Sequence, residues 1–285
     1  MILWIASYPK SGNTWLRALI SAYFYSGDGN YNEKLLKKID QFPVRKYFKD
    51  FNYNKKIVGD TTKFWIKAQE KINNDNKLRF FKTHNAFGKV NTFDFTNSEN
   101  SIGGIYILRD PRNIFTSIKN HYELNDENAI RWMTNQNNYV YDVENVNEVG
   151  YGDFQFVSSW EMNYKSWMTQ KKIPIKLVKY EELLDQTYSV VIDIIDFIYK
   201  ITNNSDSINQ IKLKNALNST TFQKLKQSEK KYGFSEAVSF TKKKKTRFFH
   251  MGPSNNWEKI LSNNLKNKLN KTFKNSLKEL SYKLC

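Results

Sequence analysis

The first 25 residues constrain the fold most, because they join a short apolar run to an amphipathic one through a polar loop. Residues 2–6 (ILWIA) are apolar without interruption, which is typical of a strand buried on both faces of a sheet. After the loop, apolar residues recur at i, i+3, i+4 spacing from Trp15 to Tyr23, as on one face of a helix. The N-terminal part is therefore predicted to be a strand–loop–helix unit.

The loop at 8–15 carries residues that suit an anion. The free N–H groups of a helix's first turn, together with the positive end of its dipole, attract phosphate. Gly12 lets the backbone approach a ligand, and Lys10 supplies positive charge. Ser11 and Thr14 supply hydroxyl donors. The Walker A pattern places its lysine after the glycine, whereas here the lysine precedes it, so we expect a phosphate-binding loop of a different type.

Two further predicted strands lead into basic residues. Residues 78–81 (LRFF) run into Lys82 and His84, whose side chains an extended backbone would place on the same side. Residues 105–108 (IYIL) run into Arg109. Ligands of open parallel sheets bind at the carboxyl ends of the strands. These side chains are therefore expected to face the same crevice as the loop.

A helix is predicted to follow Arg109, with Pro111 in its first turn and an apolar stripe as far as Tyr122. Residues 98–104 are predicted to be a polar connection before the preceding strand. An arginine can bind a phosphate through two parallel hydrogen bonds, and the hydroxyl of Ser117 can reach the same anion. Arg109 and Ser117 could therefore bind one anion together.

These motifs resemble those of the sulfotransferase family. The family's 5′-phosphosulfate loop has the pattern Tyr-Pro-Lys-Ser-Gly, a polar residue, Thr-Trp, which stands here at 8–15 with Asn13 as the polar residue. The Lys-x-His element at 82–84 is similar to the family's catalytic element. Arg109, eight residues and then Ser117 match its 3′-phosphate motif.

The resemblance also implies where the adenine lies. In the family, a tyrosine of a Tyr-Glu-Asp/Glu-Leu element lies near the adenine, and Tyr180 occupies that place here. A Thr-Ser-Phe element also borders the adenine, and it corresponds to Thr220, Thr221 and Phe222. Trp15 of the loop is expected beside them.

The stretch at 248–257 departs from the family pattern. Gly252 keeps register, but His250 and Met251 stand where the family has an Arg-Lys pair that binds the 3′-phosphate. We expect Arg247, or a protonated His250, to compensate for the missing charges.

As a whole, the resemblance implies an α/β fold, a P-loop NTPase-like parallel sheet of four to five strands flanked by helices, in one domain over residues 1–285. It implies transfer of a sulfuryl group from 3′-phosphoadenosine-5′-phosphosulfate (PAPS) to a hydroxyl or amine, with 3′,5′-ADP as product and without a metal. His84 would be the general base, and Lys10 and Lys82 would offset charge on the transferred group. Ser117 would bind the 3′-phosphate and restrain Lys10. The acceptor is expected to be a small-molecule, carbohydrate or lipid hydroxyl.

Two alternatives remain at this point. A P-loop small-molecule kinase would share the fold, but it needs Gly-Lys-Ser/Thr and a strand-end aspartate for magnesium. A basic nucleic-acid-binding protein would explain the net charge of +17 and the pI of about 9.6, but not Lys82 and His84 after a strand. The lysines are spread along the chain, and the run at 242–245 is predicted to be a solvated loop. We therefore expect no nucleic-acid partner.

The rest of the chain gives coarser expectations. Its one cysteine, Cys285, allows no intrachain disulfide, and no signal peptide or apolar run of about 18 residues is present, which favours a cytoplasmic location. The oligomeric state is not predicted. Segments 27–60 and 123–155 carry no clear period and are expected to form the acceptor pocket. A strand is predicted at 175–179, and further helices at 62–72, 129–135, 159–168, 190–199 and 257–284.

Overall fold

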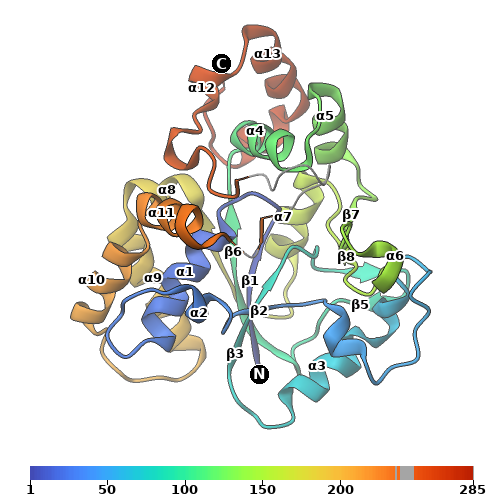
Figure 1. Cartoon of the computed structure of the whole chain (residues 1–285), viewed down its shortest axis with the longest axis vertical. Coiled ribbons are helices and arrows are strands. Elements are labelled where there is room, and N and C mark those ends of the chain that lie inside the picture. Colours follow the sequence, from blue (N-terminus) through green and yellow to red (C-terminus); the bar gives the residue numbers. More distant parts are fainter. Residues whose placement is uncertain (235, 238–246, 285) are drawn as a thin grey trace.

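Five parallel strands form the centre of the molecule, with helices on both faces (Figure 1). The chain is represented by a computed structural model, which describes residues 1–234, 236–237 and 247–284. The predicted loop at 242–245 and Cys285 lie outside the described residues. The strand order is β2-β3-β1-β6-β9. The strands are β1 (Ile2–Ser7), β2 (Asp40–Gln41), β3 (Arg79–Thr83), β6 (Ser101–Leu108) and β9 (Ile175–Lys179).

The register aligns the carboxyl ends of the strands. Ile5 of β1 pairs with Lys82 of β3, and Ser7 pairs with Ile107 of β6. On the outer side of β3, Gln41 also pairs with Lys82. The loops that leave these strands therefore share one edge of the sheet, as the rule for ligand sites in parallel sheets requires.

Alternation along β1 divides its side chains between the two faces of the sheet. Leu3 and Ile5 are fully buried against one layer of helices, and Ile2 and Trp4 are fully buried against the other. The first layer holds α1 (Asn13–Tyr25), α9 (Thr187–Ile201) and α10 (Gln210–Ser219), and the second holds α3 (Trp65–Asn73) and α7 (Trp160–Thr169). Figure 1 shows the two layers on opposite sides of the strands.

The other elements surround the carboxyl edge of the sheet or complete the two layers. The longer helices among them are α4 (Pro111–Tyr122), α5 (Asp126–Thr134), α11 (Phe222–Tyr232) and α13 (Asn263–Thr272). The shorter helices are α2 (Glu33–Leu36), α6 (Val146–Val149), α8 (Tyr180–Asp185), α12 (Trp257–Ile260), α14 (Lys274–Glu279), and the 3-10 helices η1 (Arg45–Phe48), η2 (Asp60–Phe64) and η3 (Gly252–Ser254). Two small antiparallel sheets pair β4 (Lys89–Val90) with β5 (Phe93–Asp94), and β7 (Tyr139–Val140) with β8 (Gln155–Phe156).

Two strand boundaries differ from the sequence prediction. β3 extends to Thr83, so Lys82 lies inside the strand rather than after it. β6 begins at Ser101, within the stretch that was predicted to be a connection. A Cβ at Gly104 would lie 3.0 Å from Ile175 and 3.3 Å from Trp167, so the glycine lets β9 and α7 pack closely on this strand.

The single C-terminal helix predicted at 257–284 is wrong. The segment forms the three short helices α12, α13 and α14. The hydroxyl of Ser262 accepts a hydrogen bond from the Leu265 N–H and so caps a new helix after the first break.

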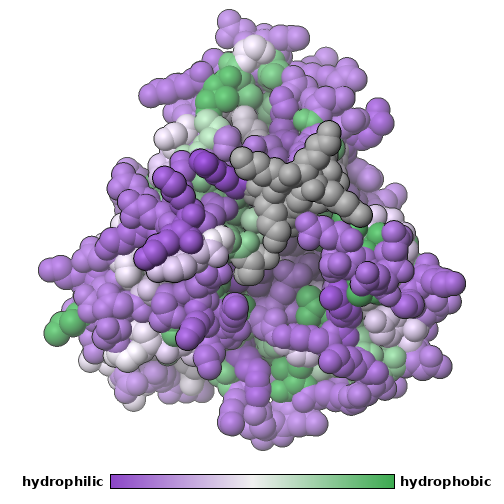
Figure 2. All heavy atoms as spheres, in the orientation of Figure 1, coloured by the Kyte–Doolittle hydropathy of each residue, from purple (hydrophilic) through white to green (hydrophobic). Residues whose placement is uncertain are grey.

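The surface in Figure 2 is mostly hydrophilic, with apolar side chains in separate groups. Among the described residues, no helix combines the length and apolar character needed to span a membrane.

Candidate functional site

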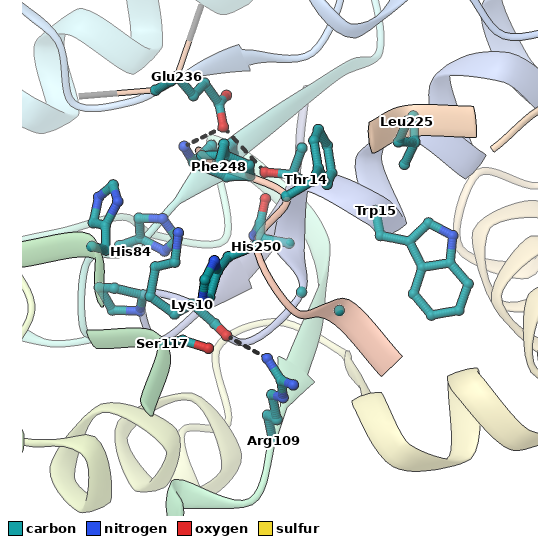
Figure 3. Close-up of a pocket in the computed structure, with 18 of the residues that line it drawn as sticks. Lys10, Thr14, Trp15, His84, Arg109, Ser117, Leu225, Glu236, Phe248 and His250 are labelled. Atoms are coloured by element: carbon teal, nitrogen blue, oxygen red, sulfur yellow. Dashed lines mark hydrogen bonds and ion pairs between the residues drawn. The ribbon is translucent and has the colours of Figure 1, made fainter. Parts of the chain in front are cut away.

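A cavity of about 1200 Å³ lies at the carboxyl edge of the sheet. Most of the predicted site residues line it, although they come from six helices and strands and from the loops beside them. They are Lys10, Gly12, Asn13, Thr14, Trp15, Lys82, His84, Arg109, Ser117, Tyr180, Thr221, Phe222, His250 and Gly252. Figure 3 shows several of these side chains pointing toward one another from separate strands and helices.

Three predicted residues are not part of the cavity lining. Ser11 is fully buried, and the hydroxyl of Thr220 is buried and donates to the carbonyl of Ala216. Arg247 is exposed. Of the two compensating residues that the sequence offered for the 3′-phosphate, only His250 lines the cavity.

The anion-binding loop depends on a glycine at its centre. Gly12 has φ 101°, a conformation that side-chain-bearing residues rarely adopt. A Cβ there would lie 2.4 Å from the ring of Tyr180. Gly12 also stands at the N-cap of α1 and has no side chain to cap it, so no side chain of the N-cap competes with a ligand for the N–H groups of the first turn.

Lys10 lies within this loop in a left-handed conformation, with φ 68°. Its Nζ is 4.1 Å from the centroid of the Phe248 ring, and its carbonyl accepts a hydrogen bond of 3.2 Å from Arg109. Burial lowers the pKa of Lys10 to about 8, and the nearby positive charges of Lys82 and Arg109 act in the same direction. The carboxylate of Glu236 acts in the opposite direction, so Lys10 is a buried cation that anionic neighbours stabilise.

His84 follows β3 and is oriented by β1. Its Nδ1 lies 2.8 Å from the carbonyl oxygen of Ser7, which can only accept, so Nδ1 carries the proton. Nε2 of the neutral ring then keeps its lone pair. Asn13 donates to the hydroxyl of Ser7 at 3.2 Å and so ties this arrangement to the anion-binding loop. Burial, reinforced by the charge of Lys82, lowers the pKa of His84 to about 3.

Arg109 and Arg112 differ in their partners: Arg112 pairs with a carboxylate, and Arg109 does not. A strand-end arginine often pairs with a nearby carboxylate, and here Arg112 forms that pair with Asp110 at 2.7 Å. The guanidinium of Arg109 instead lies 4.2 Å from the centroid of the Tyr180 ring. Its Nε is buried and has no hydrogen-bond partner among the described residues.

Ser117 contacts Asn255, a residue that the sequence analysis did not identify as part of the site. Its hydroxyl accepts a hydrogen bond of 3.0 Å from the amide of Asn255. The same amide donates to the carbonyl of Asn113, and its oxygen accepts from Thr116. Asn255 therefore fixes the C-terminal stretch to α4. It stands within the matched stretch at 248–257, but its residue type gave no indication of this contact.

Aromatic rings form one wall of the cavity. Trp15 meets Tyr180 edge to face with centroids 5.9 Å apart. The ring of Phe222 lies against Gly252, where a Cβ would be 2.2 Å from the ring. Of the residues expected near the adenine, Trp15 and Tyr180 are therefore in direct ring contact, and Phe222 packs on the C-terminal stretch at Gly252.

The donor atoms around the cavity fit an anionic nucleotide. Besides Nε of Arg109, Nε1 of Trp15 is buried without a partner among the described residues, and both residues line the cavity. Each of these groups can donate a hydrogen bond, and phosphate oxygens are acceptors. No group of three or more His, Cys, Asp or Glu side chains in the described part of the chain is arranged to hold a metal ion.

A glutamate that sequence reasoning missed lies among these cations. The carboxylate of Glu236 contacts Arg17 at 2.6 Å, the hydroxyl of Thr14 at 3.1 Å and Nζ of Lys82 at 3.5 Å. Figure 3 shows it close to Thr14 and Phe248. It lies 222 positions from Thr14 in the sequence, and no motif includes it.

The other end of the cavity is lined by the two segments that the sequence assigned to an acceptor. Polar and charged side chains are frequent there, and Arg45 is paired with both Asp142 and Asp153. The rings of Tyr139 and Tyr141 lie 5.9 Å apart in the same region.

Comparison with known proteins identifies the family. The sulfotransferase domain model matches residues 2–281. Luciferin sulfotransferase from Photinus pyralis is 24% identical over 287 residues, which cover 98% of this chain and 72% of that protein. Retinol dehydratase in complex with androsterone and the inactive cofactor PAP has a similar fold, with a TM-score of 0.58 and 15% identity over 98% of this chain and 81% of that one. Mouse sulfotransferase SULT7A1 complexed with PAP gives a TM-score of 0.54 and 14% identity over 96% and 83%.

Proposed function

The chain belongs to the family of proteins with a sulfotransferase domain, and from this premise we propose that it transfers a sulfuryl group from PAPS to a hydroxyl or amine of an acceptor. One observation carries the proposal. The loop before α1, the pair Lys82 and His84, and Arg109 leave three neighbouring strands and face a single cavity.

The donor would lie along the side of the cavity formed by α1, α4 and α8. The first turn of α1, with Lys10 and Thr14, suits the 5′ end of the nucleotide. Arg109 and Ser117 suit its 3′-phosphate. The aromatic rings of Trp15, Tyr180 and Phe222 suit the adenine. PAP in the compared structures supports a nucleotide of this type.

The chemistry would be transfer by positioning and charge stabilisation, without a covalent enzyme intermediate. Nε2 of His84 takes the acceptor's proton while the acceptor oxygen or nitrogen forms a bond to sulfur. The bond from sulfur to the phosphate oxygen breaks, and 3′,5′-ADP leaves in line with the incoming atom. Lys10 and Lys82 offset the charge that develops on the transferred group and on the leaving phosphate.

The acceptor is proposed to be a small molecule, carbohydrate or lipid that bears a hydroxyl or amine. The paired Arg45 and the tyrosine rings in the acceptor half of the cavity support a partly polar molecule. That no metal is needed, that no nucleic acid binds, and that the chain is cytoplasmic stay predictions.

The replacement His84→Ala tests the assignment. Removing the base is expected to slow transfer by about 10²–10⁴-fold, while 3′,5′-ADP binds within threefold of wild type, because a base acts on the acceptor. As a matched control, Lys10→Ala should weaken 3′,5′-ADP binding. Titration calorimetry and an assay with labelled PAPS measure the two effects. A His84→Ala protein that retains near-normal transfer would overturn the role of His84, and a chain that binds ATP but not 3′,5′-ADP would overturn the function.

A further inference from the structure

Glu236 is placed where an anion of the donor is expected. Among the described residues, its partners lie on the loop side of the cavity: Thr14 and Arg17 in the first two turns of α1, and Lys82 near the end of β3. Thr14 and Lys82 both line the cavity, as does Glu236 itself. Figure 3 shows the carboxylate above the loop, joined by a dashed line to Thr14.

The contacts of Glu236 resemble those that a phosphate or sulfate would make at this position. A carboxylate offers oxygen acceptors and negative charge to one hydroxyl and two cations, as an anion at a helix N-terminus does. Under the proposed function, the phosphosulfate end of the donor needs Thr14 and Lys82. The carboxylate and the donor therefore compete for the same two groups.

A carboxylate at this position stabilises the ligand-free chain. The side chain of Arg17 is only 4% exposed, and a buried cation without a partner is strongly unfavourable. Burial alone would raise the pKa of Glu236, but the charges of Arg17 and Lys82 outweigh it and hold the pKa well below its usual range. Glu236 is thus ionised at neutral pH and neutralises part of the cationic site.

We propose that Glu236 is a built-in competitor of the donor: its carboxylate occupies part of the phosphosulfate site in the ligand-free chain, and the anionic end of the donor displaces it. This inference rests on the proposed function. A ligand that must displace a bound group binds with an affinity reduced by the population in which the site is free. The carboxylate therefore weakens the binding of donor and product, and it favours product release by returning to its partners.

The test is Glu236→Gln, which keeps the shape of the side chain and removes the charge. We expect 3′,5′-ADP to bind about 10- to 100-fold more tightly than to wild type in titration calorimetry, the range expected for loss of a competing charge-assisted hydrogen bond. The matched control is Glu99→Gln, which changes the net charge equally at an exposed position and should leave the dissociation constant unchanged.

Thermal unfolding supplies a second readout. The Tm of ligand-free Glu236→Gln should be lower than that of wild type, because buried Arg17 has lost its charged partner. Saturating 3′,5′-ADP should restore most of the loss in Tm. A merely structural glutamate would lower the Tm equally with and without ligand. If Glu236→Gln is too unstable to titrate, Glu236→Asp, one methylene shorter, should show a smaller gain in affinity. Unchanged or weaker binding of 3′,5′-ADP to both variants would overturn the proposal.

Inorganic pyrophosphate separates this proposal from the proposed function. If wild type does not bind 3′,5′-ADP, the proposed function fails. In that case, the proposal that Glu236 competes with an anion is supported if Glu236→Gln binds pyrophosphate more tightly than wild type does. The proposal is overturned if the two proteins bind pyrophosphate equally.

Discussion

At the scale of single residues, the protonation of Lys10 should control donor affinity in alkaline solution. Burial lowers the pKa of Lys10 to about 8, so the ammonium form is lost as the pH rises through 8. An anionic ligand binds the charged form better, and we expect the dissociation constant of 3′,5′-ADP to rise by up to about tenfold per pH unit above 8. Phosphate groups have a second pKa near 6, so they are almost fully ionised above pH 8 and do not disturb the trend there. Calorimetric titrations between pH 7 and pH 10 measure the trend.

The variant Lys10→Arg isolates this effect, because arginine keeps its charge over the whole range. Its dissociation constant should change much less with pH than that of wild type. Burial also lowers the pKa of Lys82, which faces the same cavity beside Glu236. Equal slopes for wild type and Lys10→Arg would therefore assign the titration to Lys82 and contradict the prediction for Lys10.

Site residues that directly follow strands could be predicted from the sequence. Site residues whose partners lie far away in the sequence could not. Lys10, His84 and Arg109 follow β1, β3 and β6, so local pattern and the strand-end rule were enough to bring them together. Glu236 and Asn255 reach the site through contacts with residues more than 130 positions away. No local pattern encodes such a contact.

At the scale of elements, Arg112 joins α4 to the C-terminal helices. Its guanidinium pairs with Asp110, donates to Asn270 on α13 and to the carbonyl of Lys283, and lies 3.8 Å from the centroid of the Trp257 ring. Arg112→Ala should lower the free energy of unfolding by about 3–5 kcal/mol, because it leaves Asp110 buried without its partner. Denaturant unfolding measures the change.

Arg131→Ala on α5 is the matched control, because that side chain is exposed and its loss should change the free energy of unfolding by less than about 0.5 kcal/mol. A loss below about 1 kcal/mol for Arg112→Ala would show that the C-terminal helices are held mainly by their apolar contacts.

Helices and strands were predicted correctly where their apolar pattern continued over enough residues to show its period. The strand–loop–helix unit and the helices α4, α7 and α9 follow clear apolar patterns, and the main sheet has the predicted four to five strands. β2 was not predicted, because its two residues, Asp40 and Gln41, are polar and too few to show alternation. The breaks in the C-terminal helix were missed because the apolar pattern continues across the cap at Ser262.

At the scale of the whole molecule, the two apolar cores that flank the main sheet share the same strands. Residues of β1 alternate between the core that contains Trp4 and Trp65 and the core that contains Leu3 and Leu16. Neither core can lose its helices without exposing one face of the same five-stranded sheet. This arrangement supports our proposal that residues 1–285 form one domain.

We therefore expect thermal unfolding to show one cooperative transition. Tryptophan fluorescence would report mainly on one face, since Trp4, Trp65, Trp160 and Trp167 are all buried in the same core. Far-UV circular dichroism would report on the helices of both faces. The two signals should give coincident curves, and saturating 3′,5′-ADP should shift both to higher temperature by the same amount, because a ligand that binds only the folded state stabilises the whole cooperative unit. Two separated curves, with only one shifted by the ligand, would mean that the faces unfold independently and that the chain contains more than one folding unit.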